Sequence, residues 1–332
     1  MFRDQREALR ELCVSIRPKR IGCLGAGCLN DIPIETFLRI GSEVYLVDWI
    51  PRISEEGFRS DVIQREGASS YCFIRELQPA PERFCGNFSP AALGQDRVCN
   101  RFLLEEGPRP RCANYSRSAE PHFLEADVTL GRATAFARRV ERWVGFSKTP
   151  AQAFRKAIDE LSRCSTVNEK IAIPPDSLDL VTSSMVVSQF DHEPYTFFSK
   201  LLALQFGSRL LAEEERLLPL MERLRSGLFR IQVEGHIREI YRLVEKRRGR
   251  VFFSVELFCS SSNRDEFFLV QEIHQAMDMI GKYFHFDFHL ISPDQSLRMI
   301  ETHSGTSIVQ SYVLRPKEKM AQSSAPVRSK TQ

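Results

Sequence analysis

One stretch of the chain, residues 21–48, restricts the fold more than any other: IGCLGAGCLNDIPIETFLRIGSEVYLVD. It opens with an apolar run at 21–24, continues through a turn of small residues and a helix-like segment, and closes with an apolar run that ends at Asp48. Short apolar runs of this kind are typical of parallel strands that are buried on both faces. The stretch therefore predicts a strand, a crossover helix and a second strand of a parallel α/β sheet.

The turn after the first predicted strand, Gly25-Ala26-Gly27, carries almost no side chain, so a ligand can approach its backbone closely. Asn30 or Asp31 can cap the helix that follows. Ligands of open α/β sheets bind at the carboxyl ends of the strands, where an acid such as Asp48 can accept hydrogen bonds from ribose hydroxyls. These residues favour a nucleotide site. The alternative left open is an ordinary strand–helix–strand unit whose glycines only shape a tight turn.

The composition is that of a globular protein. The chain has 332 residues, of which 42% are hydrophobic and 27% are charged, enough for one elaborated domain or two small ones. No apolar run approaches the ~20 residues that a membrane span needs. The formal net charge of +3 is too small to indicate a nucleic-acid partner.

The amino-terminal segment is charged throughout and lacks the apolar region of a signal peptide. A helical stripe instead predicts a packed helix within residues 1–20, and its members are Leu9, Leu12, Cys13 and Ile16. Nine cysteines without a secretion signal favour reduced thiols and a cytoplasmic location. No metal site is predicted, because the evenly spaced cysteines contain no close pair of the kind that structural zinc sites use; these are Cys72, Cys85, Cys99 and Cys112.

Periodicity and apolar runs predict the later elements. Further strands are expected at residues 123–126, within 176–184, and at 250–258, 284–291 and 306–314, of which the last two can pair in antiparallel fashion. Helices are expected at residues 53–67, 132–143, 148–163, from 194 to a break at Pro219, at 228–246 and at 266–283. Residues 78–121 are expected to form an insertion or long loop, and residues 317–332 a disordered tail.

The order of these elements resembles that of the class I S-adenosylmethionine-dependent methyltransferases, a Rossmann-like superfamily. The segment LGAG at 24–27, followed by Asp31, resembles the first motif of that family, which lies against the methionine end of the cofactor. Asp48 resembles the acid that holds the ribose hydroxyls, and Trp49 would then flank the adenine. The segment EADV at 125–128 resembles the motif after the third strand, which meets the adenine amino group. The segment LDLVTSS at 178–184 resembles the fourth-strand motif beside the methyl-transfer site.

The resemblance implies a mostly parallel seven-stranded sheet with helices on both faces and an antiparallel last strand. It implies one domain at residues 21–316 with an insertion at about 78–121. It also implies S-adenosyl-L-methionine as the cofactor, with these contact residues: Gly25, Ala26, Gly27, Asp31, Asp48, Trp49, Asp127, Val128 and Ser183.

The chain also departs from the pattern of that family. Cys23 stands where many members have an acid, and Leu29 where many have a third glycine. The fourth motif lacks the Asn/Asp-Pro-Pro-Tyr/Phe signature, which disfavours the amino methylation carried out by DNA, glutamine and some RNA methyltransferases. The departures keep a second hypothesis open, a catalytically inactive methyltransferase-like binding protein. A third, an NAD(P)-dependent oxidoreductase, would require glycine in place of Asn30.

The function implied by the resemblance is methyl transfer to a small-molecule nucleophile, since no nucleic-acid module accompanies the domain. The candidate catalytic residues are Asp191, His192 and Tyr195, which follow the fourth strand. A histidine suits the removal of a proton from a hydroxyl or amine near neutral pH. The alternative is that His192 lies in solvent in the loop leading into a helix. The acceptor, the subfamily and the oligomeric state stay open.

Overall fold

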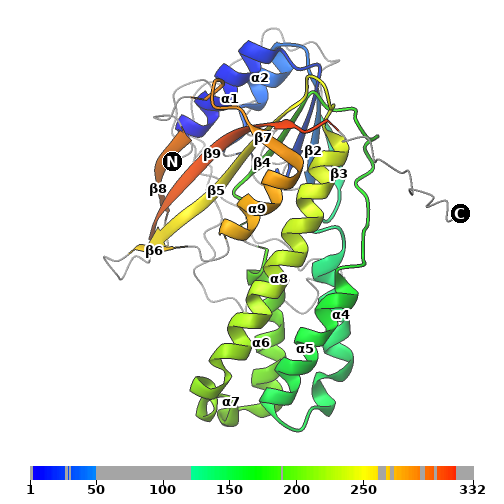
Figure 1. The fold of residues 1–332 in the computed structure, drawn as a ribbon, viewed down its shortest axis with the longest axis vertical. Helices are drawn as coiled ribbons and strands as arrows, with labels where there is room; N and C mark the ends of the chain where they lie inside the picture. The colour runs from blue at the N-terminus through cyan, green and yellow to red at the C-terminus, as the bar shows by residue number, and fades with distance from the viewer. Residues whose placement is uncertain are drawn as a thin grey trace, which may run out of the picture.

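A computed structural model describes residues 3–26, 29, 31–49, 121–187, 190–260, 267–269, 273–291, 296–302 and 305–318 (Figure 1). In these ranges the helices are α1 (Arg3–Ile16), α2 (Ile34–Arg39), α4 (Arg132–Trp143), η2 (Val144–Phe146), α5 (Pro150–Cys164), α6 (His192–Phe206), α7 (Ser208–Ala212), α8 (Glu214–Leu243) and α9 (Ile273–Tyr283). The strands are β1 (Arg20–Leu24), β2 (Glu43–Asp48), β3 (His122–Glu125), β4 (Leu180–Ser184), β5 (Arg250–Ser260), β6 (Phe267–Leu269), β7 (Phe284–Phe286), β8 (Leu297–Thr302) and β9 (Gly305–Pro316).

These strands form one mostly parallel sheet. Seven of them follow the order β3-β2-β1-β4-β5-β9-β7, while β6 pairs with β5 and β8 pairs with β9. The first five strands of that order are parallel, whereas β9 is antiparallel to both β5 and β7. The strand order reverses between β1 and β4, and ligands of open α/β sheets bind at the carboxyl side of such a switch point. The predicted Rossmann-like sheet with an antiparallel last strand is confirmed.

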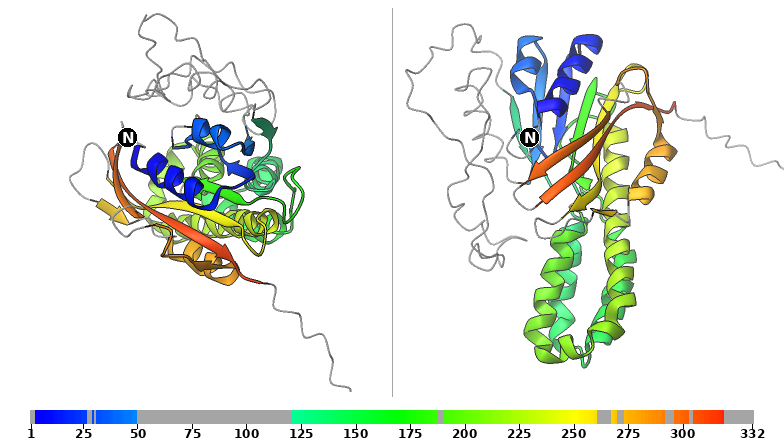
Figure 2. Two further views of the ribbon diagram at one scale, coloured as in Figure 1. Left: turned by 90° about the horizontal axis from the view of Figure 1, so that it is seen from above. Right: turned by 90° about the vertical axis from the view of Figure 1, so that its left-hand side faces the viewer.

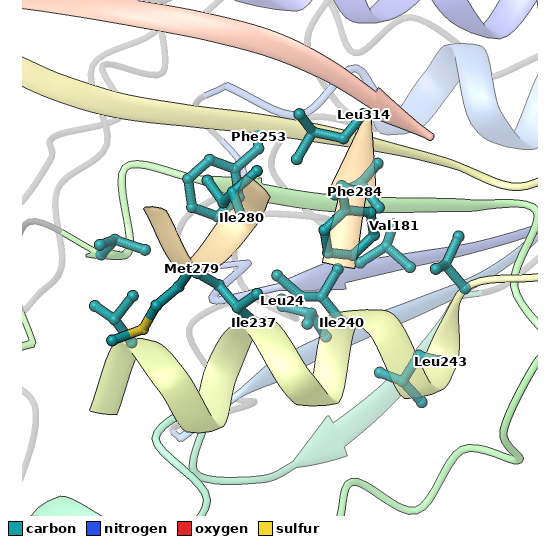
Figure 3. Packing of buried hydrophobic residues seen from close by; sticks show 14 of the residues in the cluster. Leu24, Val181, Ile237, Ile240, Leu243, Phe253, Met279, Ile280, Phe284 and Leu314 are labelled. Carbon is teal, nitrogen blue, oxygen red and sulfur yellow. The ribbon is translucent and has the colours of Figure 1, made fainter. Parts of the chain in front are cut away.

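Helices cover both faces of the sheet. On one face α1 and α2 bury Leu9 and Phe37 against apolar residues of β1 and β2. On the other face α8 and α9 bury Ile240 and Ile280 against residues such as Phe253 (Figure 3). Because both faces are covered, β1, β2 and β4 are short, nearly continuous apolar runs, and this made them recognisable in the sequence.

Beyond the carboxyl ends of β3 and β4 the chain forms a helical bundle (Figures 1 and 2). α4, α5, α6 and the first half of α8 enclose a third apolar cluster, separate from the two on the faces of the sheet. Phe198 lies in it, with ring contacts to Phe136, Trp143 and Phe154. With 30 residues, α8 is about 45 Å long. Its first half therefore belongs to the bundle and its second half covers the sheet.

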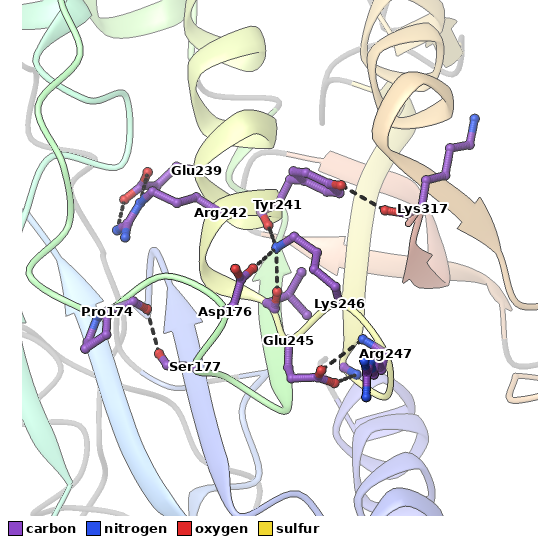
Figure 4. Close-up of polar contacts among 12 residues, drawn as sticks. Pro174, Asp176, Ser177, Glu239, Tyr241, Arg242, Glu245, Lys246, Arg247 and Lys317 are labelled. Atoms are coloured by element: carbon purple, nitrogen blue, oxygen red, sulfur yellow. Dashed lines mark hydrogen bonds and ion pairs between the residues drawn. The ribbon is translucent and has the colours of Figure 1, made fainter. Parts of the chain in front are cut away.

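Polar contacts fix the far end of α8, where the chain turns into β5 (Figure 4). Lys246 pairs with Asp176 and donates to backbone carbonyls at the end of the helix. The Glu245 carboxylate accepts hydrogen bonds from the N–H groups of Arg247 at 3.0 Å and Gly249 at 3.2 Å. These contacts set the direction in which β5 enters the sheet beside β4.

The helix break expected at Pro219 is wrong. α8 begins at Glu214, well before the expected start at residue 228, and runs through the proline to Leu243. Pro219 lies in the second turn, where its ring leaves the carbonyl of Glu215 without an intrahelical donor. Because Glu215 is exposed, water can replace that bond.

Two expectations near the carboxyl terminus are also wrong in part. The helix expected at 266–283 begins at Ile273, because residues 267–269 form β6 and pair with the end of β5. The strand expected at 284–291 ends at Phe286. A strand that was not predicted, β8, occupies part of the polar segment and pairs with β9. For β6, pairing with the end of β5 overrides the local helical pattern.

Several predictions lie outside the described residues: the helix at 53–67, the insertion up to residue 120, its cysteines, and the tail beyond residue 318. The domain boundaries therefore stay predictions. Among the described residues, no helix combines the length and apolar character needed to cross a membrane. The same residues contain no group of three or more His, Cys, Asp or Glu side chains placed to hold a metal ion.

Candidate functional site

The carboxyl ends of β1, β2 and β3 lie side by side and gather the first group of predicted site residues. The N–H groups of Gly25 and Ala26 donate to the carbonyl oxygen of Val47, at 2.8 and 3.1 Å, which holds the turn after β1 against β2. The N–H of Ala126 donates to the carbonyl oxygen of Asp48 at 3.0 Å, which holds the segment after β3 against β2. The three segments thus form one edge across strands spaced about 4.8 Å apart.

Gly25 needs the absence of a side chain for two reasons. Its φ of +69° lies in the left-handed region, and a Cβ there would lie 2.4 Å from Cγ2 of Val186, in the segment after β4. The turn therefore has the bare backbone that a nucleotide site requires, and in this conformation Val186 lies against it. Trp49, the residue after Asp48, is half-buried. Gly27 lies outside the described residues.

Asp127 organises the loop between β3 and α4. Its carboxylate accepts hydrogen bonds from the N–H and the hydroxyl of Thr129, at 2.7 and 2.6 Å, and from the N–H of Gly131 at 3.2 Å. The loop is therefore ordered by the same carboxylate that the resemblance assigns to the adenine. Val128, the next residue, is half-buried, and its carbonyl oxygen points to α8, where it contacts His236.

Ser183, at the carboxyl end of β4, is fully buried and contacts the same histidine. Its Oγ lies 2.8 Å from Nε2 of His236, and Nδ1 of His236 lies 3.1 Å from the carbonyl oxygen of Val128. Because a carbonyl only accepts, Nδ1 carries the proton and Nε2 accepts from the serine hydroxyl. Burial lowers the pKa of His236 to about 4, so the ring is neutral at physiological pH. The ring of Phe190 packs edge-on against it.

His236 was not predicted as part of the site. It lies on the apolar stripe of the helix expected at 228–246, seven residues after Phe229 and four before Ile240. This spacing is the single feature of the sequence that indicates a buried position for His236. Its partners lie 53 and 108 residues away along the chain, so local patterns could not identify them.

A second polar cluster lies at the carboxyl end of β4, beneath α1. The amide nitrogen of Gln5 donates to the hydroxyls of Ser184 at 3.0 Å and Ser254 at 2.7 Å, which lie 2.8 Å apart. The Ser184 side chain also hydrogen-bonds the carboxyl of Asp31. Burial raises the pKa of that carboxyl above its ordinary value, and the bond to Ser184 offsets part of the rise.

The expectation that Asp31 caps the next helix is wrong. The residue before α2 is Pro33, and no side-chain hydrogen bond caps the helix. Asp31 instead meets Ser184, because β1 and β4 are adjacent and parallel. Cys23, which stands where the family often has an acid, is fully buried. Burial raises the pKa of its thiol to about 12, so it carries no charge near neutral pH.

The three candidate catalytic residues lie together at the start of α6. Asp191 is buried, and one of its carboxylate oxygens accepts from Nε and Nη2 of Arg225 on α8, at 2.9 and 2.8 Å. The guanidinium carbon of Arg225 lies 5.4 Å from the ring centroid of Tyr195, which is half-buried. His192 is exposed at the first residue of the helix. The ion pair thus anchors α6 to α8, and the imidazole of His192 faces solvent.

Comparison with known proteins finds solved structures that resemble this chain but no related sequence. No known family profile matches the chain, and no curated protein matches it in sequence. One similar solved structure is a TehB-like SAM-dependent methyltransferase from Corynebacterium glutamicum, with 8% identity and a TM-score of 0.33, covering 93% of this chain and 88% of that one. Another is an S-adenosylmethionine-dependent methyltransferase from Clostridium acetobutylicum, with 9% identity and a TM-score of 0.34, covering 95% and 92%.

Because these TM-scores lie below 0.5, the fold assignment rests on the sheet itself. The strand order, with five parallel strands and an antiparallel strand inserted next to the last one, is that of the class I methyltransferase fold that the sequence resembles. The described site adds a glycine turn after β1, an acid at the end of β2 and an acid after β3.

Proposed function

We propose that this protein is an S-adenosylmethionine-dependent methyltransferase that acts on a small-molecule nucleophile, and that it works in the cytoplasm. The observation that carries the proposal is the shared edge at the carboxyl ends of β1, β2 and β3. There the bare Gly25 turn, Asp48 and Asp127 follow one another on neighbouring strands. An extended nucleotide lying along this edge would meet all three.

Each group along the edge suits one part of the cofactor. The backbone of Gly25, Ala26 and Gly27 would lie against the methionine end, and Asp48 would accept hydrogen bonds from the ribose hydroxyls. Trp49, Asp127 and Val128 would contact the adenine. Asp31 and Ser183 complete the proposed contacts, with the Asp31 carboxyl beside Ser184 at the end of β4.

The bound cofactor supplies an electrophilic methyl group on a sulfonium. The protein must then hold the nucleophile in line with that methyl, and orientation alone can contribute about 7–11 kcal/mol in the best cases. The start of α6 is suited to this task because the Asp191–Arg225 ion pair fixes it. His192 is our candidate for removing a proton from the acceptor, since its imidazole is exposed while Asp191 is already paired.

The first test is isothermal titration of the protein with S-adenosylmethionine, S-adenosylhomocysteine and NADH. We expect micromolar binding of both sulfur nucleotides. Asp48→Ala should weaken both by about 1–3 kcal/mol, the scale of hydrogen bonds to a charged group. Glu43→Ala is the matched control, because Glu43 is an exposed acid at the opposite end of the same strand.

The outcomes separate the three hypotheses. Equal affinities for wild type and Asp48→Ala would remove Asp48 from the site. NADH binding without binding of the sulfur nucleotides would favour the oxidoreductase. Tight binding of S-adenosylmethionine without turnover across a broad panel of acceptors would favour an inactive binding protein.

A further inference from the structure

Gln232, in the middle of α8, is a buried side chain with no described role. It is 1% exposed, and neither its amide oxygen nor its amide nitrogen finds a hydrogen-bond partner among the described residues. A buried amide that leaves both a donor and an acceptor unpaired costs free energy. Gln5, the buried glutamine on the opposite face of the sheet, differs because its amide nitrogen donates to two serines.

Two anchors show which way Gln232 faces. Seven residues before it, Arg225 pairs with Asp191 at the start of α6. Four residues after it, His236 contacts Ser183 and the carbonyl oxygen of Val128. Residues spaced by seven and four share one side of a helix. Gln232 therefore faces the carboxyl edge of the sheet, about 6 Å along the helix axis from His236.

The order of the strands decides which part of a bound nucleotide this position would meet. β3 lies at the end of the parallel set, followed by β2 and β1. A nucleotide with its ribose at Asp48 on β2 and its amino-acid end at the Gly25 turn on β1 has its base on the β3 side. The loop after β3 contains Val128, and His236 joins that loop to α8 one helical turn from Gln232.

We propose that Gln232 reads the base of the bound cofactor through its side-chain amide, an inference that rests on the proposed function. An amide presents a donor and an acceptor side by side. The amino group and a neighbouring ring nitrogen of adenine present the complementary pair. Binding would satisfy both unpaired atoms of Gln232 at once, so the residue adds affinity for the base at a cost in stability to the free protein.

The test compares Gln232→Met with Gln275→Met. Gln275, on α9, is the control because its amide nitrogen donates to Ser226 of α8 at 2.9 Å, so that only its amide oxygen is buried without a partner among the described residues. The ligands are S-adenosylhomocysteine and 5′-methylthioadenosine, which keeps the base and ribose but lacks the amino-acid end. We expect Gln232→Met to weaken both ligands at least about tenfold. Its melting temperature without ligand should be unchanged or raised, and Gln275→Met should bind both ligands as wild type does.

Each other result has a definite reading. Wild-type affinity in Gln232→Met overturns the inference, and so does a lowered melting temperature, which would mean that the amide is used within the free protein. If Gln232→Met loses affinity for S-adenosylhomocysteine but keeps its affinity for methylthioadenosine, the assignment to the base is overturned. The assignment is also overturned if the wild-type protein binds S-adenosylhomocysteine but not methylthioadenosine. Failure of wild-type protein to bind S-adenosylhomocysteine removes the proposed function itself, and the inference falls with it.

Discussion

At the residue scale, His236 illustrates how one side chain can join three parts of the site. It lies on α8, accepts a hydrogen bond from Ser183 on β4 and donates one to the carbonyl of Val128 after β3. Each ring nitrogen has one partner, and the ring is completely buried. A proton added to Nε2 would reverse the hydrogen bond, with Nε2 donating to the Ser183 hydroxyl oxygen, and would place a charge in an apolar setting.

Acid should therefore destabilise the protein through His236. Its folded pKa of about 4 lies below the ordinary value of 6.5, so the unfolded chain binds this proton first as the pH falls. The contribution of neutral His236 to the free energy of unfolding is fully present above about pH 6.5. It falls by up to about 3 kcal/mol as the pH drops to about 4. Guanidinium unfolding at several pH values should show this slope, and His236→Gln should flatten it. His192→Gln, which removes an exposed histidine, should leave the slope unchanged; an equal slope in His236→Gln would contradict the assignment.

At the element scale, α8 links the sheet to the helical bundle. Leu224 and Leu228 lie in the bundle core, and Ile240 and Leu243 lie in the core beside the sheet. α8 also makes polar contacts with its neighbours. The ion pair between Arg225 of α8 and Asp191 holds the start of α6 against it. The pair is asymmetric, because the Asp191 side chain is 8% exposed and that of Arg225 is 50% exposed.

This asymmetry predicts unequal effects of breaking the pair. Arg225→Leu should destabilise the protein by about 1–3 kcal/mol, because it leaves a buried carboxylate without its partner. Asp191→Asn should cost less than about 1 kcal/mol, since water still solvates the half-exposed guanidinium. The double variant should be more stable than Arg225→Leu alone. Chemical denaturation of the four proteins measures the cycle, and equal costs for the two single variants would show that burial does not set the energy.

At the scale of the whole molecule, the sheet and the bundle have separate cores and a shared helix. The chain contains two tryptophans, and each lies in one of these parts. Trp49 follows β2 at the edge of the sheet, and Trp143 ends α4 in the bundle core. The two indoles can therefore report on the unfolding of each part.

We expect the two parts to unfold together, because α8 cannot lose its bundle half without loosening the half that covers the sheet. Phe198→Ala, deep in the bundle core, should cost about 3–5 kcal/mol. The Trp49→Phe and Trp143→Phe variants each keep one tryptophan. In both variants, Phe198→Ala should shift the unfolding curve followed by tryptophan fluorescence to the same midpoint. A shift confined to the Trp143 signal would show that the bundle is an independent unit.

The elements that could be predicted are those whose signal lies in consecutive residues. The apolar runs of β1, β2 and β5 and the periodic segment of α4 lie where they were expected. The residues of β6 were expected to be helical because Phe268 was counted in the apolar set of the helix that follows. Only the end of β5, nearby in space, makes them a strand. The role of Asp31 was also mispredicted from local sequence. It was expected to cap the next helix, but its partner is Ser184, which is distant in the chain.

The places of the candidate residues at the strand ends were predictable to the same extent. Gly25, Asp48 and Asp127 were singled out by their places at strand ends, and the parallel sheet brings their segments to one edge. The neighbours of Ser183 and Asp191 were not foreseen. Their partners, His236 and Arg225, lie on α8, 53 and 34 residues further along the chain, where local patterns do not reach.

The sequence by itself determined the class of fold, because burial on both faces and glycine turn chemistry are written into short runs of neighbouring residues. It also determined which residues stand at the carboxyl ends of the first strands. The tertiary structure alone decided that α8 spans bundle and sheet. It alone decided that His236 is neutral and that Gln232 is buried without a partner. Desolvation and hydrogen bonding depend on what surrounds a group in space, and these surroundings come from residues far apart in the chain.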